Sequence, residues 1–174
     1  MNRKLDVYLD WGEPVCIGHL WIHRQKGRET ASFEYTRHWL SSGFELEPAL
    51  PLTVGVFHVE QGLSLFRCFS DSAPDRWGRL LLTRRENTLA RQEKRSPVTL
   101  MESDFLLGVN DITRHGAYRF TEAGSDVFQT DSGKDSIPPL VNLRALMNAS
   151  KRLIKHTENE QDLKLLLAPG SSLG

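Results

Sequence analysis

The chain opens with alternating apolar and polar positions. Leu5, Val7 and Leu9 are each separated by one residue of a different kind, which is the period of a strand with one buried face. Gly and Pro interrupt the pattern at 11–14 and predict a turn. A first strand followed by a turn is therefore expected here.

A return strand is expected directly after this turn. Val15, Ile17 and Trp21 supply its apolar positions. Gly18 inside the run predicts a β-bulge or a close backbone approach. A third strand is expected at 32–35, so the opening third of the chain is predicted to form a small antiparallel sheet.

Two less regular segments follow the sheet. Residues 39–51 contain Ser, Gly and Pro and predict an irregular surface connection. Residues 63–69 are apolar enough for a strand or for a short buried stretch.

A helix is expected to begin at 71–75, with Ser72 as its cap. Trp77, Leu80 and Leu81 then recur at three- and four-residue spacing and predict the buried face of that helix.

The next helix signal resembles a capping box at 99–102. Met101, Phe105 and Leu106 are predicted to form its buried stripe, and Gly108 is predicted to end it in a left-handed conformation.

The last third begins with a predicted strand at 116–120 and a polar linker at 121–139. The apolar positions of an amphipathic helix follow: Leu140, Leu143, Met147 and Ile154. A shorter helix near 162–167 follows an Asn159 cap. Together the segments predict an α+β fold in which a small β-rich unit precedes helices.

Charge and cysteine content narrow the function classes. The 174 residues hold 22 Lys or Arg and 22 Asp or Glu, so no bulk field favours nucleic-acid binding. No apolar run approaches the ~20 residues of a membrane-spanning helix, and the basic N-terminus lacks the apolar core of a signal peptide. We therefore expect a cytoplasmic protein. Cys16 and Cys68 predict buried strand residues and neither a disulfide framework nor a zinc site.

The last residues form a candidate phosphate loop through Gly170, Ser171, Ser172 and Gly174. Glycine lets backbone N–H groups approach phosphate oxygens. No Lys or Arg follows them, although phosphate-binding loops generally add such a cation. A flexible terminus is the alternative interpretation.

Other polar clusters favour structural roles. The seven cations between 76 and 95 are typical of a solvated helix face. The six histidines lack metal-ligand spacing, so no metal site is expected. Asp71, Asp75 and Asp104 resemble a carboxylate group, but helix capping explains them more simply.

Three motifs in order resemble the HipA family of serine/threonine protein kinases. Pro74, Asp75, Gly78 and Arg79 match the helix start written Leu-Pro-Asp-x-x-Gly-Arg, with Ala73 in place of Leu. Residues 104–120 are similar to the next block, a helix leading into a Gly-Ala strand, and 165–174 to the entry of the glycine-rich nucleotide loop.

This resemblance implies the organisation of the chain. An N-terminal subdomain would span 1–120, a linker 121–139, and the start of a kinase-like N-lobe 140–174, ending in a truncated glycine-rich loop. ATP and Mg²⁺ would be the cofactors of the full-length protein. The family's phosphate-pairing lysine, catalytic aspartate and magnesium ligands follow that loop and match nothing here, so no cofactor and no kinase activity are expected for this chain alone. Ser172, or alternatively Ser171, matches the serine that autophosphorylates.

The resemblance also implies partners. The full protein would be a toxin that phosphorylates a translation-related protein, such as a tRNA synthetase, and a small DNA-binding antitoxin would restrain it. The alternative is a stand-alone regulatory protein that acts like an antitoxin on a separate HipA-like kinase. A nucleic-acid-binding module is disfavoured by the zero net charge.

Overall fold

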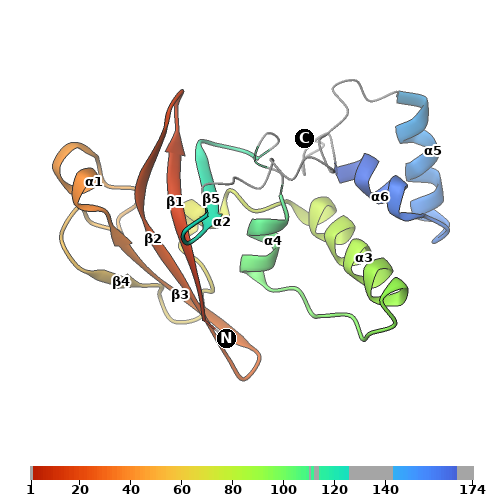
Figure 1. Ribbon diagram of the computed structural model, residues 1–174, viewed down its shortest axis with the longest axis horizontal. Helices are drawn as coiled ribbons and strands as arrows, with labels where there is room; N and C mark the ends of the chain where they lie inside the picture. The colour runs from red at the N-terminus through yellow and green to blue at the C-terminus, as the bar shows by residue number, and fades with distance from the viewer. Residues whose placement is uncertain (1, 110, 112–113, 126–142, 168–174) are drawn as a thin grey trace.

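The computed structural model describes residues 2–109, 111, 114–125 and 143–167. Within these ranges the chain forms a five-stranded antiparallel sheet with helices beside it (Figure 1). The strand order is β4-β3-β2-β1-β5. The α+β class and the antiparallel sheet predicted from the sequence are confirmed.

Three long strands form the centre of the sheet: β1 (Asn2–Asp10), β2 (Pro14–Gln25) and β3 (Arg28–Tyr35). A two-residue turn joins β2 to β3, with φ of 49° at Lys26 and 75° at Gly27. Positive φ at both positions is the turn geometry that matches the twist of an antiparallel hairpin.

The glycine in β2 marks both features that the sequence suggested. The pairing of β2 with β1 passes from Cys16 to Gly18 and leaves Ile17 as the extra residue of a β-bulge. A Cβ on Gly18 would lie 2.2 Å from Cζ of Phe33. The ring of the neighbouring strand therefore occupies the space that a side chain would need.

The bulge changes which residues of β2 face the core. Beyond it, Leu20 and Ile22 are buried at 0% and 1% exposure. Trp21, which the sequence placed with Ile17, lies on the opposite face, where the Lys4 ammonium is 5.4 Å from its ring centroid. A one-residue change of register reverses the faces of all residues that follow it.

Short strands form both edges of the sheet. β4 (Val56–His58) pairs with β3, and β5 (Tyr118–Glu122) pairs with β1. The strand expected at 116–120 therefore begins two residues later. β4 was not predicted, because three residues are too few to establish an alternating pattern.

Two short helices differ from the sequence-based expectation. α1 (Arg37–Ser42) covers the start of the segment 39–51, which was expected to be irregular. Thr36 caps it by accepting a hydrogen bond from the third residue of the helix. α2 (Arg67–Ser70) lies in the stretch 63–69, which is buried as one alternative predicted, but is not a strand.

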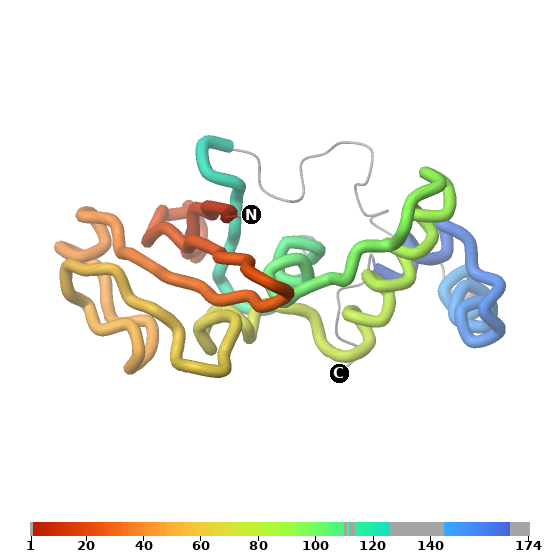
Figure 2. Tube along the Cα trace, turned by 90° about the horizontal axis from the view of Figure 1, so that it is seen from below, coloured from red at the N-terminus to blue at the C-terminus, as the bar shows by residue number. Residues whose placement is uncertain are grey.

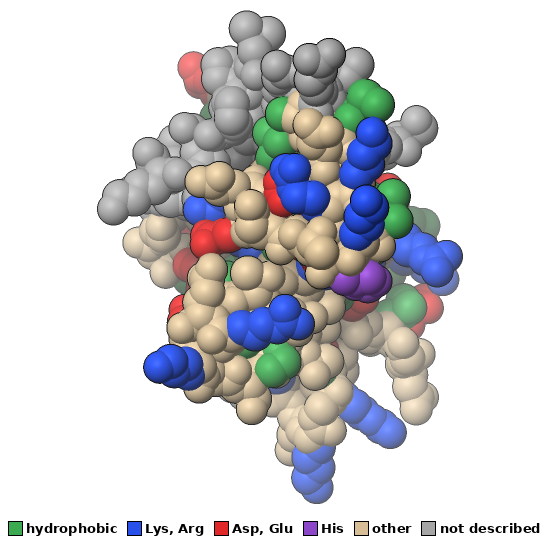
Figure 3. Space-filling view, turned by 90° about the vertical axis from the view of Figure 1, so that its right-hand side faces the viewer, with side chains coloured by type: hydrophobic (Ala, Val, Ile, Leu, Met, Phe, Trp, Pro, Cys, Tyr) green, Lys and Arg blue, Asp and Glu red, His purple; other side chains and the backbone are tan. Residues whose placement is uncertain are grey.

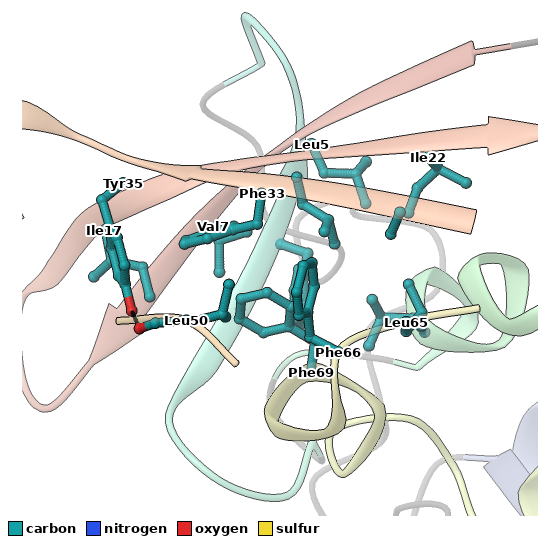
Figure 4. Packing of buried hydrophobic residues seen from close by; sticks show 14 of the residues in the cluster. Leu5, Val7, Ile17, Ile22, Phe33, Tyr35, Leu50, Leu65, Phe66 and Phe69 are labelled. Atoms are coloured by element: carbon teal, nitrogen blue, oxygen red, sulfur yellow. Dashed lines mark hydrogen bonds between the residues drawn. The ribbon is translucent and has the colours of Figure 1, made fainter. Parts of the chain in front are cut away.

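The main core lies against one face of the sheet (Figure 4). Strand residues meet α2 and the loop before it there, and ten of the core side chains are Leu5, Val7, Ile17, Ile22, Phe33, Tyr35, Leu50, Leu65, Phe66 and Phe69. The Phe33 ring centroid is 5.0 Å from that of Tyr35 and 5.1 Å from that of Phe69. The buried Tyr35 hydroxyl donates to the Leu50 carbonyl at 2.6 Å, which satisfies its polar end.

Four further helices extend the molecule away from the sheet: α3 (Arg76–Gln92), α4 (Glu102–Gly108), α5 (Leu143–Ile154) and α6 (Glu160–Leu167). α4 lies between the sheet and α3, and α5 and α6 lie beyond α3 (Figures 1 and 2). A second apolar cluster joins α3, α5 and α6 through Leu81, Ala149, Leu153, Leu163 and Leu166.

The buried faces of two helices differ from those predicted. Leu80 of α3 is 41% exposed, and Met147 and Ile154 of α5 are 52% and 74% exposed. In α3 only Leu80 departs from the prediction, because Leu81 is buried at 0% exposure and Trp77 packs against the second cluster, as expected. In α5 the buried residue is instead Leu153, at 1% exposure. Apolar residues occur on more than one side of each helix, and periodicity alone does not say which side meets a partner.

The start and end of α4 also differ from the sequence-based expectation. Met101, not residue 99, is the N-cap, and its backbone N–H donates to the Asp104 carboxylate at 2.9 Å. Gly108 ends the helix as predicted, but without a left-handed conformation. A Cβ on Gly108 would lie 2.8 Å from Cδ1 of Leu82, so close packing against α3 explains the glycine.

The predicted linker 121–139 begins inside β5, and its residues from 126 onward lie outside the described ranges. The domain boundaries and the kinase-like N-lobe therefore stay predictions. None of the described helices has the length and apolar character needed to span a bilayer.

We expect Gly18→Ala to lower the free energy of unfolding by about 2 kcal/mol, because the new methyl group would displace the Phe33 ring and the backbone of β3. Urea denaturation followed by circular dichroism measures the change. Thr30→Ala, at an exposed position of β3, is the control and should change it by less than ~0.5 kcal/mol. A Gly18→Ala protein as stable as the parent would contradict this account of the bulge.

Candidate functional site

The predicted nucleotide loop is approached through α6. Gly170, Ser171, Ser172 and Gly174 lie outside the described residues, and the last described residue before them is Leu167. Within the described residues, the site therefore consists of the elements that lead into the loop and of the neighbouring helices that carry the motifs.

The end of α6 is fixed against the start of α3. Leu163 and Leu166 are 0% and 6% exposed and belong to the same cluster as Leu81 of α3. Trp77 and Leu167 pack against that cluster. The apolar side of α6 is therefore covered by α3 and α5.

The first motif forms the N-terminus of α3 around a different cap from the one predicted. Asp75 is the N-cap, and its Oδ1 accepts a hydrogen bond from Gly78 N at 2.9 Å. Ser72 is instead buried, at 4% exposure. The capping role expected for Asp75 and Asp104 is confirmed, because the Asp104 side chain accepts from the backbone at the start of α4.

A bidentate ion pair joins the first motif to α4. The Arg79 guanidinium donates to the two carboxylate oxygens of Glu102 at 2.6 and 2.7 Å. Its Cζ lies 4.9 Å from the Phe105 ring centroid, within cation–π range. The hydrogen bonds from Arg79 hold the pKa of Glu102 below its usual value.

Arg114, from the second motif, is the most deeply buried charge of this region, with a side chain at 0% exposure. It donates to the Asp111 carboxylate at 2.7 Å and to the Ser72 carbonyl at 3.1 Å. It also donates to the carbonyls of Leu106 at 2.7 Å and Val109 at 3.1 Å. One side chain thus connects the segment before α3 with the C-terminal end of α4.

The Arg114 guanidinium also lies close to the sheet. Its Cζ lies 5.1 Å from the ring centroid of Phe120 in β5. Burial lowers the pKa of Arg114, and the neighbouring Asp111 carboxylate opposes that effect. Arg114 lies in the second motif, but the sequence predicts no role for it, because burial of an arginine has no periodic signal.

A second buried polar group joins the β2–β3 hairpin to α4. Glu29, at 7% exposure, accepts hydrogen bonds from Ser103 N at 2.9 Å and Ser103 Oγ at 2.7 Å. Arg24 lies 2.8 Å from Glu29 and 2.7 Å from Asp104. The sequence carried a signal for this site, because Glu29 has the same strand parity as the buried Phe33.

Several of the cations between 76 and 95 are paired with acids. Arg84 donates to Glu158 at 2.7 Å and contacts His156 at 3.0 Å, and Arg95 forms an ion pair with Glu86. Figure 3 shows Lys and Arg side chains scattered over the helical end of the molecule, with acidic and apolar side chains among them. This distribution agrees with a solvated helix face and does not form a continuous basic surface.

The described ranges contain no cluster of three His, Cys, Asp or Glu side chains arranged to hold a metal ion. His19 Nδ1 lies 2.6 Å from Asp6, and His23 Nε2 lies 2.9 Å from a serine hydroxyl of β3.

Cys16 is a strand residue as expected, whereas Cys68 lies in α2; both are only half-buried. Burial raises the pKa of both thiols, which keeps them protonated.

We expect Arg114→Met to lower the free energy of unfolding by about 3 kcal/mol or more, because it leaves the buried Asp111 carboxylate without its guanidinium. Denaturant titration measures the loss. Adding Asp111→Leu should recover part of it, because the uncompensated charge is then removed. Arg91→Met, on the exposed surface of α3, is the control and should change stability by less than ~0.5 kcal/mol. Equal effects of Arg114→Met and Arg91→Met would rule out the role of the buried guanidinium.

The α5–α6 connection gives a pH-dependent prediction. Arg152 Nε donates to Asp162 Oδ2 at 2.7 Å, and Asp162 and Asn159 cap one another's backbone N–H groups. The hydrogen bonds from Arg152 lower the pKa of the Asp162 carboxyl. This group therefore stabilises the fold above about pH 4 and loses that contribution as the pH falls through its lowered pKa.

Arg152→Met should reduce the loss of unfolding free energy between about pH 6 and about pH 2.5, because Asp162 then titrates closer to its unfolded value. Urea denaturation at several pH values gives the slope. Lys151→Met removes a neighbouring exposed cation and should leave the slope unchanged. An identical slope in the Arg152→Met and parent proteins would refute the coupling.

Comparisons with known proteins agree with this arrangement. A family model described as the HipA N-terminal domain matches residues 5–102, which is more than half of the 174 residues. Searches of curated proteins and of solved structures found no match. The matched range contains most of β1, the strands β2, β3 and β4, the first motif and the whole of α3. The chain therefore belongs to the HipA N-terminal domain family.

Proposed function

We propose that this chain is the N-terminal part of a HipA-like toxin, a serine/threonine protein kinase, and that it forms the scaffold from which a nucleotide loop emerges. The strongest support is the packing of α6 on α3. Leu167 packs against the same apolar cluster as Trp77 of the first motif, so the segment that enters the Gly–Ser tail starts from a fixed position. A loop that cradles phosphates needs such an anchor, because preorganised N–H donors bind without a further ordering cost.

The catalytic groups belong to the rest of the proposed kinase. Phosphoryl transfer depends on cations and metal ions that neutralise charge on the transferring group. No residue of this sequence matches the family's phosphate-pairing lysine, catalytic aspartate or magnesium ligands. We therefore assign ATP and Mg²⁺ binding to the full-length protein and no phosphoryl transfer to this chain by itself.

The serines of the tail give the proposed kinase a means of control. Ser172, or alternatively Ser171, matches the autophosphorylated serine of the family. A phosphate there adds about 1.5 to 2 negative charges. Those charges repel the phosphates of ATP and occupy the N–H donors that would bind them. The proposed partners are a DNA-binding antitoxin and a translation-related substrate such as a tRNA synthetase.

The main alternative is a stand-alone regulatory protein that binds a separate HipA-like kinase. That role requires the N-terminal subdomain and has no need of the segment after the linker. Here α5 and α6 bury Ala149, Leu153 and Leu163 against α3. The segment is thus an integral part of the molecule, and this favours the kinase scaffold.

We expect the purified chain to transfer no phosphate from ATP and Mg²⁺ to itself or to a general protein acceptor above a heat-denatured control. Radiolabelled ATP with detection on a gel is a suitable assay, with an active unrelated kinase as the positive control. Turnover by the chain alone would disprove the assignment of the catalytic groups. Phosphorylation of Ser172 only when a HipA-like catalytic lobe is added would support it.

The coding sequence separates the two roles. An open frame that continues beyond the codon for Gly174 into a lysine and a catalytic aspartate supports the kinase scaffold. A stop codon followed by a separate kinase frame supports the stand-alone protein. Sequencing of the transcript across this point distinguishes the two outcomes.

A further inference from the structure

The turn between β1 and β2 carries an exposed aromatic pair. Trp11 is 72% exposed, and its ring stacks on Phe44 with centroids 5.6 Å apart and planes at 12°. Phe44, which follows α1, is itself 43% exposed. We refer to Trp11 and Phe44 together as the aromatic shelf. Large aromatic side chains at this exposure are common anchors of binding surfaces.

Packing against Trp39 holds the aromatic shelf in place. The Phe44 ring meets Trp39 edge-on at 5.0 Å, and the Trp39 indole N–H donates to the Phe44 carbonyl at 3.0 Å. Trp39 is buried, at 7% exposure, and a Cβ on Gly43 would lie 2.4 Å from its ring. The Phe44 ring therefore has a fixed position, and the stacked Trp11 indole keeps its other face open. A surface ordered before binding loses little entropy when a ligand arrives.

Two exposed glutamates lie next to the aromatic shelf in the sequence. Glu13 follows Trp11 in the same turn and Glu45 directly follows Phe44; both are exposed, and neither forms a hydrogen bond or ion pair with a described residue. Asp10 is already paired with Arg119, at 3.5 Å. The nearest cation along α1 is Arg37, at the end of that helix away from Phe44. The two glutamates are thus available to a positively charged ligand.

We propose that the aromatic shelf binds an arginine side chain from a segment of a partner protein. A planar guanidinium stacks on the open face of an indole and is attracted by its negative π-surface. Its remaining N–H groups then donate to carboxylates at the rim, which is the geometry that arginine favours. An acidic partner segment would be repelled by Glu13 and Glu45. A purely apolar segment would form no ion pair with these two residues. The proposal is independent of the kinase assignment, because no residue of the shelf belongs to the three motifs.

A peptide titration of the ¹⁵N-labelled chain tests this inference. The indole N–H resonance of Trp11 is assigned by its disappearance in Trp11→Leu, and acetyl-Gly-Arg-Gly-amide is added to millimolar concentration. We expect a saturable shift of that resonance. The same peptide with citrulline in place of arginine keeps the shape and loses the charge, and should bind at least ~3-fold more weakly.

Two sets of variants complete the test. Trp11→Leu should weaken binding of the arginine peptide by at least ~3-fold, measured on backbone resonances of the turn. Glu13→Gln combined with Glu45→Gln should weaken it by about 2- to 5-fold at low salt, with less effect at high salt. Ile154→Ala, at an equally exposed apolar position of α5 at the other end of the molecule (Figure 1), should leave binding unchanged. Equal affinity for the arginine and citrulline peptides, or undiminished binding by Trp11→Leu, would overturn the proposal.

Discussion

The buried guanidinium of Arg114 connects the parts of this molecule. Its hydrogen bonds join the segment before α3 to the end of α4, and its Cζ lies 5.1 Å from the ring centroid of Phe120 in β5. A charge with 0% exposure would be prohibitively unfavourable without compensation. The Asp111 carboxylate and three carbonyl oxygens supply that compensation from several directions. The relative positions of sheet and helices therefore depend on a directional polar contact as well as on apolar packing.

Polar contacts also join α4 to the sheet and to α3. Glu29 and Ser103 join the β2–β3 hairpin to α4, and Arg79 and Glu102 join α4 to α3. The described apolar residues form two separate clusters, one against the sheet and one among α3, α5 and α6. The HipA N-terminal domain family match covers the sheet side and α3. Hydrogen-bonded contacts of defined geometry thus orient the part that leads into the proposed nucleotide loop.

Much of the fold was predictable from the sequence because strand alternation is a local property. Leu5, Val7 and Leu9 are all buried in β1, and the glycine expected to mark a bulge does so. The limits of the buried faces of α3 and α5 were not predictable, because the exposed Leu80 and Ile154 are as apolar as Leu81, which is buried as predicted. Only the position of the partner helices decides between such faces.

The candidate site was predictable only in part. The capping residues have short-range signals, and Asp75 occupies the position that its type favours. Strand parity places Glu29 on the buried face, but its contact with Ser103 and the contact of Arg114 with Ser72 have no local signal, because these partners are distant in sequence. The predicted loop residues, Gly170, Ser171, Ser172 and Gly174, lie outside the described part of the chain and stay a prediction.

The bulge in β2 has a consequence for comparing this chain with its homologues. Because Ile17 is the extra residue, a homologue that lacks one residue here would have a regular strand and still direct Val15, Leu20 and Ile22 to the same face. A one-residue deletion anywhere else in the strand would reverse the faces of all residues on one side of the deletion. Alignments of the family should therefore tolerate a one-residue gap at this point and at no other position of the strand.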